Sequence, residues 1–64
     1  MWFWQQKFYV GQAVKLKVFG QYNNCWGIIR GKHSISTDSW VVDVIYKDEI
    51  SARYAFSEDE IEAA

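Results

Sequence analysis

The chain has 64 residues, with four each of Trp, Tyr and Phe, one cysteine, no proline and a formal net charge of −1. A chain of this length forms a single domain and buries only about 60% of the surface that its unfolded form exposes. It therefore needs bulky core side chains, a metal, disulfides or a partner to be stable. With Cys25 as the only cysteine and His33 as the only histidine, an intrachain disulfide and a zinc site made of four Cys and His ligands are excluded.

A lone cysteine is typical of a reducing compartment. No basic segment precedes an apolar run at the amino end, so we expect no secretory signal. The apolar runs are also too short to span a membrane. We therefore expect a soluble protein of the cytoplasm with no membrane partner.

The small net charge hides an uneven distribution of charge along the chain. Residues 1–37 carry five Lys or Arg and no acid, a net charge of +5. Residues 38–64 carry eight acids against Lys47 and Arg53, which gives 2 − 8 = −6. Because the two parts of a compact domain can lie side by side, this split indicates a nucleic-acid partner less strongly than an overall basic charge would.

The first predicted strand covers residues 13–19, where apolar and polar side chains alternate as "AVKLKVF". Alternation with period two predicts a strand that is buried on one face. The next residues, "GQYNN" at 20–24, are of the types that turns require. One strand face would carry Val14, Leu16 and Val18, and the other Ala13, Lys15, Lys17 and Phe19.

The second predicted strand covers residues 25–32, "CWGIIRGK". Gly27 and Gly31 inside this strand predict a bulge, a sharp bend or the close approach of another backbone. A polar loop follows at residues 33–39. Cys25 is expected to be a half-buried apolar residue without a reactive role.

The third predicted strand covers residues 40–46, "WVVDVIY", and a tight turn leads to the fourth at residues 50–56. Trp40 is predicted to be the central ring of the core, and Asp43 marks the wetter face. The core face would carry Trp40, Val42, Val44 and Tyr46 of the third strand and Ala52, Tyr54 and Phe56 of the fourth.

The end of the chain predicts one helical turn and a short last strand. Ser57 lies three residues before Glu60, which is the spacing of a capping box. Ile61 would then enter the core. Five short strands this close together cannot form two packed sheets, so the fold class is all-β and the sheet is expected to curl into a small barrel.

Four segments resemble the SH3-like barrels of the broad KOW and Tudor-like group, which includes small bacterial and prophage proteins. The segments are "YVGQAVKL", "NCWGIIRG", "SWVVDVIYKDE" and "YAFSEDEIEA". The resemblance covers residues 9–62 and implies a five-stranded SH3-like barrel with one short 3-10 turn before the last strand. Residues 1–8 lie outside it, as an aromatic segment packed on the barrel or extending it. The polyproline-binding SH3 domains are a poorer match, because "FGQYNN" holds no acid.

Neither a catalytic site nor a metal site is expected. His33 lies near Ser34, Ser36 and Asp38, but a nucleophile needs a positioned base in a cleft, and a polar loop in so short a chain is better explained as solvated. The acids at residues 58, 59, 60 and 62 are expected to cap the helical turn, where negative charge is favoured, so we expect no cofactor.

The basic residues of the first two strands predict one possible binding surface. Lys15 and Lys17 share a strand face, and Arg30 and Lys32 are expected to share another. If the strands pair, the four cations would lie together, with Phe19, Tyr22 and Trp26 beside them. Cations for phosphates and rings for bases are what single-stranded nucleic acid requires. The alternative interpretation is a solvated strand face whose lysines protect the sheet edge.

The opening residues "MWFW" predict another surface. Alternation places Trp2 and Trp4 on one side and Phe3 on the other, so a strand added to the barrel would leave some ring surface outside. Trp and Tyr are enriched at binding hot spots. Packing on the protein's own barrel, contact with a second chain and contact with a membrane remain the alternatives.

The sequence therefore predicts a non-enzymatic module that binds a protein partner or a second copy of itself. The expected binding residues are Trp2, Phe3, Trp4, Phe19, Tyr22 and Trp26. Nucleic-acid binding through Lys15, Lys17, Arg30 and Lys32 is the alternative.

Overall fold

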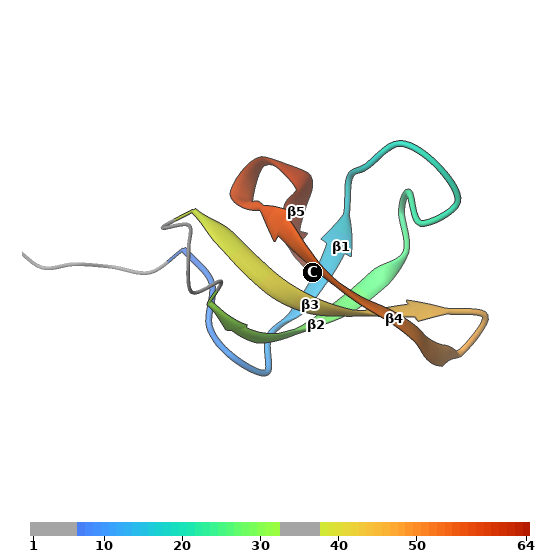
Figure 1. Cartoon of the computed structure of the whole chain (residues 1–64), viewed down its shortest axis with the longest axis horizontal. Coiled ribbons are helices and arrows are strands. Elements are labelled where there is room, and N and C mark those ends of the chain that lie inside the picture. Colours follow the sequence, from blue (N-terminus) through green and yellow to red (C-terminus); the bar gives the residue numbers. More distant parts are fainter. Residues whose placement is uncertain (1–6, 33–37) are drawn as a thin grey trace, which may run out of the picture.

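The computed structural model describes residues 7–32 and 38–64, which form five antiparallel strands and one turn of 3-10 helix (Figure 1). One sheet contains all five strands, in the order β4-β3-β2-β1-β5. The all-β prediction is confirmed, although the first strand ends earlier than expected. The elements are β1 (Ala13–Leu16), β2 (Trp26–Lys32), β3 (Ser39–Tyr46), β4 (Glu49–Ser57), η1 (Glu58–Glu60) and β5 (Ile61–Ala63).

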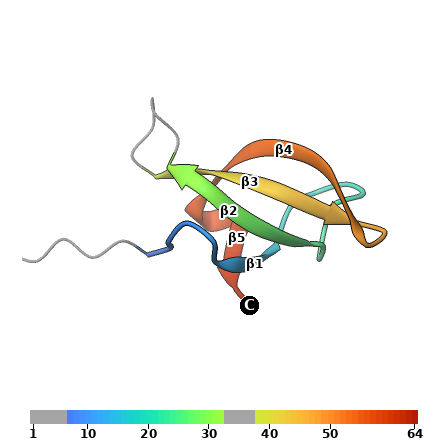
Figure 2. The same ribbon diagram turned by 90° about the horizontal axis from the view of Figure 1, so that it is seen from below.

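The sheet is strongly curled, because its two outermost strands are joined by only η1. Four strand spacings in a flat sheet would separate β4 from β5 by about 19 Å. The chain from Ser57 to Ile61 can extend over at most about 14 Å. Figure 2 shows the result: β4 arches on one side of β2 and β3, and β1 and β5 lie on the other.

The core fills the inside of this curl. Trp40 is 1% exposed, and Phe8 packs its ring against the Trp40 ring edge-on, with centroids 5.9 Å apart. The prediction that Trp40 is central is confirmed. Phe8 belongs to the segment that is predicted to pack on the barrel or extend it, and its burial places residue 8 in the core. The buried apolar residues are Phe8, Val14, Leu16, Ile29, Trp40, Val42, Val44, Phe56 and Ile61.

The β3–β4 hairpin fixes which side chains of β4 face the core. Lys47 and Asp48 both have positive φ, as a mirror-image two-residue turn requires. A register shift between Val44 and Ile45 then leaves Ser51 unpaired. After it, Tyr54 lies opposite Val42 and Phe56 opposite Trp40. Both therefore stand on the face of Trp40, as the sequence predicts.

At Gly27, β2 lies too close to β3 to leave room for a side chain. A Cβ atom at Gly27 would lie 2.5 Å from Val42 Cγ1 and 3.3 Å from the backbone oxygen of Asp43. Val42 is fully buried, so it has little room to move aside. Gly31, in the same strand, has nothing within 4 Å of the same position.

These two glycines make a matched pair for a stability test. Gly27→Ala should lower the free energy of unfolding by about 1–3 kcal/mol, as overpacking a filled core does. Gly31→Ala should leave it unchanged or raise it slightly, because alanine restricts the unfolded chain. Urea denaturation of both variants measures the difference. Equal effects of the two substitutions would contradict the close approach at Gly27.

Candidate protein-binding surface

Three tyrosines from three different segments meet at one end of the core. Tyr22, in the β1–β2 connection, packs edge-on against Tyr46, with ring centroids 5.5 Å apart and an interplanar angle of 81°. The Tyr22 ring also lies 6.2 Å from that of Tyr54, at 46°. Tyr54 in turn contacts the edge of Phe56, whose ring centroid is 6.3 Å away. We call Tyr22, Tyr46 and Tyr54 the tyrosine cluster.

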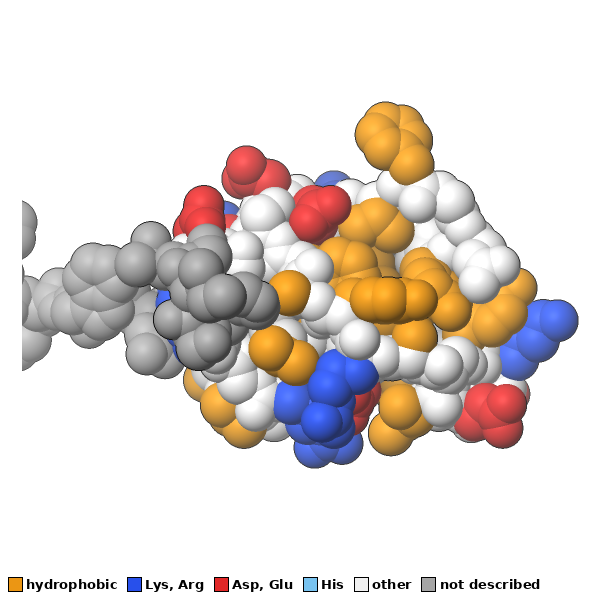
Figure 3. Space-filling model, viewed as in Figure 1, with side chains coloured by type: hydrophobic (Ala, Val, Ile, Leu, Met, Phe, Trp, Pro, Cys, Tyr) orange, Lys and Arg blue, Asp and Glu red, His pale blue; other side chains and the backbone are white. Residues whose placement is uncertain are grey.

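The tyrosine cluster lies where the curled sheet stops covering its own inner face. Tyr54 stands on the same face as Trp40, but β4 is the last strand in the sheet order, and Tyr54 remains 53% exposed. Figure 3 shows hydrophobic side chains gathered on this side of the molecule. In the described part of the chain, no hydrogen bond involves the hydroxyl groups of the tyrosine cluster. A partner could therefore use both the ring surfaces and the hydroxyls.

Backbone hydrogen bonds hold the β1–β2 connection in a defined shape. The amide of Asn24 donates to the oxygen of Leu16 at 2.9 Å, and the amide of Cys25 donates to the oxygen of Tyr22 at 3.1 Å. Gly20 adopts a φ of 105°, which the turn needs and which side chains rarely allow. Next to it, Phe19 is fully exposed. The exposed Phe19 ring thus belongs to a loop whose conformation is fixed by backbone hydrogen bonds.

The structure divides the predicted aromatic set between two faces. Phe19 and Tyr22 share the β1–β2 connection, as expected from the sequence. Trp26, by contrast, lies on the outer face of β2, opposite Ile45 of β3, so it does not join the tyrosine cluster. Trp2, Phe3 and Trp4 lie outside the described residues. Sequence reasoning assigned Tyr46 and Tyr54 to the core face and missed that they remain accessible there.

The predicted basic patch is mostly paired with acids. Lys17 Nζ lies 3.1 Å from Glu62 Oε2, which faces it from β5. Lys32 Nζ lies 3.9 Å from Glu58 Oε2, and Arg30 bonds Asp43. Lys15 forms no ion pair with another described residue.

The expectation that Arg30 and Lys32 share a strand face is wrong. A register shift between Ile29 and Gly31 inserts Arg30 as an extra residue. Lys32 therefore lies opposite Trp40 on the core side, with its Nζ 4.3 Å from the centre of a Trp40 ring. Two glycines in the sequence signalled an irregularity, but they did not show its position or its effect on the following residue.

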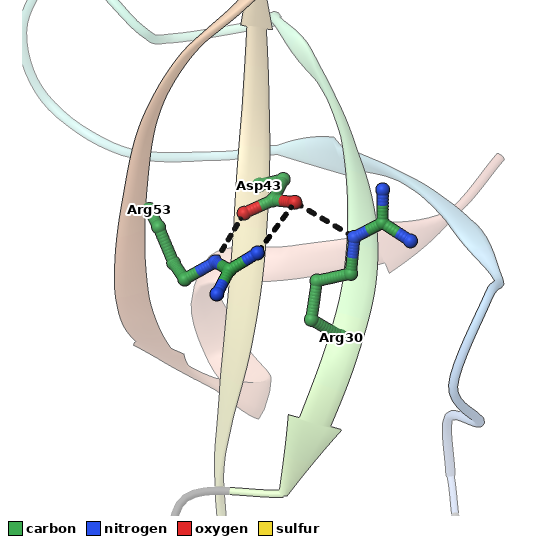
Figure 4. Close-up of polar contacts among 3 residues, drawn as sticks. All are labelled: Arg30, Asp43 and Arg53. Atoms are coloured by element: carbon green, nitrogen blue, oxygen red, sulfur yellow. Dashed lines mark hydrogen bonds and ion pairs between the residues drawn. The ribbon is translucent and has the colours of Figure 1, made fainter.

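Asp43 is the one charged residue buried among the described residues. Figure 4 shows it between two arginines from the neighbouring strands. Arg53 donates from Nε to Oδ1 at 2.6 Å and from Nη2 to Oδ2 at 3.2 Å, and Arg30 donates from Nε to Oδ2 at 2.7 Å. The sequence correctly put Asp43 opposite the core face, but the two arginines leave it only 3% exposed. These hydrogen bonds, from Arg53 first and then Arg30, lower the pKa of Asp43 from 3.8 to about 2.

The lowered pKa gives a signed prediction for acid stability. The Asp43 carboxylate stabilises the fold fully above pH 3.8 and loses that contribution as the pH falls towards 2. Asp43→Asn should therefore be less stable than the wild type at pH 6, and the gap should shrink between pH 4 and pH 2. Thermal melts across this range measure it. Asp59→Asn, which removes an exposed carboxylate from η1, serves as the control, and a gap that stays constant from pH 6 to pH 2 would contradict the prediction.

The acidic residues near the end of the chain have structural partners. The amide of Ser57 donates to Glu60 Oε1 at 2.9 Å, as the capping-box spacing predicts. Trp40 Nε1 donates to Glu58 Oε2 at 3.0 Å, which ties the central ring to η1. Within residues 7–32 and 38–64, no group of acids, cysteines or histidines is placed to hold a metal ion. The same residues form no pocket.

In comparisons with known proteins, no family model matches the chain, and no curated protein or solved structure shows significant similarity to it. The resemblance to SH3-like barrels thus stays a prediction. No helix in the described part of the chain is long and apolar enough to cross a membrane.

Proposed function

We propose that this protein is a non-enzymatic module of the cytoplasm that binds a protein partner, or a second copy of itself, through an exposed aromatic surface. The surface consists of the tyrosine cluster and Phe19, to which we add the segment with Trp2, Phe3 and Trp4. The observation that carries the proposal is the exposure of Tyr54 at the uncovered end of the core and of Phe19 in the β1–β2 connection.

We further propose that the sheet closes as an SH3-like barrel. Two features support this: five antiparallel strands with a single 3-10 turn before the last, and a curl strong enough for η1 to join the two outermost strands. In such a barrel the β1–β2 connection would face β4 across the open end of the core. The contact of Tyr22 with Tyr54 has this arrangement.

A protein partner agrees with the surface better than a nucleic acid does. Ion pairs with acids occupy Lys17, Arg30 and Lys32, so a phosphate backbone would have to displace or meet those carboxylates. Tyrosine, in contrast, supplies a large, stiff contact area with a polar tip, and it is enriched where protein interfaces are strongest. Nucleic-acid binding through Lys15 and the three paired cations remains the alternative proposal.

A displayed library of random peptides tests the aromatic surface. Peptides selected on the wild-type protein should bind the variant with Tyr54→Ser and Phe19→Ser more weakly by roughly a hundredfold, because two anchors at about 1.5 kcal/mol each are lost. Both side chains are exposed, so the fold should persist.

The matched control substitutes two other exposed apolar residues, Tyr9→Ser with Val10→Ser, which should leave the peptide affinity unchanged. Isothermal titration calorimetry gives the dissociation constants. If no peptide is selected, or if the selected peptides bind all three proteins equally, the proposed surface is wrong.

The residues before position 7 need a separate test, since they lie outside the described residues. We expect Trp2→Ala with Trp4→Ala to lower the melting temperature modestly and to weaken association with a partner or with a second copy by roughly a thousandfold. Thermal melts and sedimentation over a wide concentration range provide both measurements. A large fall in melting temperature, in a protein that is monomeric and partner-free before and after, would instead identify the two rings as a cover for the core.

A further inference from the structure

Strand β4 has an open edge along its length. It is the last strand in the sheet order, it is nine residues long, and it pairs only with β3. Among residues 7–32 and 38–64, no backbone hydrogen bond connects its other edge to a neighbouring segment. From Ala52 to Ser57 its ladder with β3 is regular. Such an edge presents a row of N–H and C=O groups that can pair with another strand.

The side chains on the two faces of β4 differ in chemical character. On the inner side lies the tyrosine cluster, to which β4 contributes Tyr54. On the outer side lies Arg53, the neighbour of Tyr54 in the chain, and its partner Asp43 and then Arg30 follow on β3 and β2. Successive side chains of an added strand would point alternately to these two sides. The edge therefore favours a segment whose side chains differ in chemical character between odd and even positions.

The outer side has capacity left for a carboxylate. Two guanidinium groups share the single carboxylate of Asp43, so the three groups together carry a net charge of +1. Arg53 bonds Asp43 through Nε and Nη2, and its Nη1 makes no hydrogen bond with another described residue. The Arg53 side chain is 63% exposed. Terminal guanidinium nitrogens bind carboxylates in a forked geometry, which makes an acidic side chain the matching ligand.

We propose that β4 binds an extended segment of a partner protein in which apolar and acidic side chains alternate, by adding it as a sixth strand. The apolar side chains would cover the tyrosine cluster, and the acidic ones would reach Arg53. Main-chain hydrogen bonds would supply affinity, and the alternation would supply specificity. This inference rests on the proposed function, because it uses the same tyrosines.

A second copy of this chain fits the edge less well. Arg53 is the middle residue of β4, so two β4 strands paired antiparallel over their full length would place Arg53 opposite Arg53. Like charges directly opposite each other destabilise a strand pair. An acidic segment avoids this repulsion and neutralises the charge that Asp43 leaves.

The probes are three blocked nine-residue peptides. The first alternates Val and Glu, the second alternates Val and Lys, and the third is the Val–Glu peptide with N-methyl groups on its central backbone nitrogens. The third keeps the side chains and lacks the main-chain donors. Titration by NMR gives affinities, and amide hydrogen exchange shows which residues of the protein become protected.

The Val–Glu peptide should bind and should slow exchange of amides in residues 52–56. The Val–Lys and N-methylated peptides should bind at least tenfold more weakly. Arg53→Gln should reduce the preference for Glu over Lys about tenfold, and Lys15→Gln on β1, which removes the same charge three strands away, should not. If Arg53→Gln does not fold, as judged by amide dispersion, Arg30→Gln replaces it.

The inference is overturned if the Val–Glu peptide does not bind, if it binds no better than either control peptide, or if protection appears away from β4. Protection of β4 that grows with protein concentration in the absence of peptide would make a second copy the occupant and would also overturn it. The peptides selected from the random library, whose binding depends on Phe19 and Tyr54, distinguish strand addition at β4 from the proposed function. If they bind without protecting β4, strand addition fails and the aromatic surface stands; if no such peptides exist, the proposed function itself fails.

Discussion

A single five-stranded sheet has to cover its own apolar face, and the rest of this structure depends on that constraint. The chain meets it by curling the sheet around Trp40, whose ring contacts Phe8 and bonds to Glu58 of η1. The short η1 brings β5 back to β1, so that Ile61 is buried in the same core. In a domain this small, a few bulky side chains have to supply most of the core.

The exposed aromatic surface is a consequence of the same curl. Trp40 is fully covered, whereas Tyr54, on the core face of the last strand in the sheet order, stays half exposed. The β1–β2 connection covers part of this region by placing Tyr22 against Tyr46 and Tyr54. Tyrosine tolerates such a position, since its ring can pack on the core while its hydroxyl stays in water. The tyrosine cluster thus joins the core through the contact of Tyr54 with Phe56.

Folding also reorganises the uneven charge of the chain. The acidic end returns to the basic beginning because β5 pairs with β1 and η1 lies beside Trp40, and this brings Glu62 to Lys17 and Glu58 to Lys32. Two regions of opposite charge in the sequence become neighbouring ion pairs on the surface. Asp43 differs, because two arginines share it and a positive charge is left beside the open edge of β4.

The sequence by itself determined the features that depend on neighbours along the chain. Period-two alternation predicted the strands and the burial of Trp40, and the spacing of Ser57 and Glu60 predicted the capped turn before β5. Only the tertiary structure decided features that depend on residues distant in the sequence. The bulge at Arg30 turned Lys32 to the other face, because an extra residue in one strand reverses the alternation after it. Asp43 became buried because Arg30 and Arg53 reach it from two neighbouring strands. The tyrosine cluster, likewise, exists only because the curl of the sheet brings the β1–β2 connection against β4. No local sequence pattern indicates which strand will lie at the edge of a sheet.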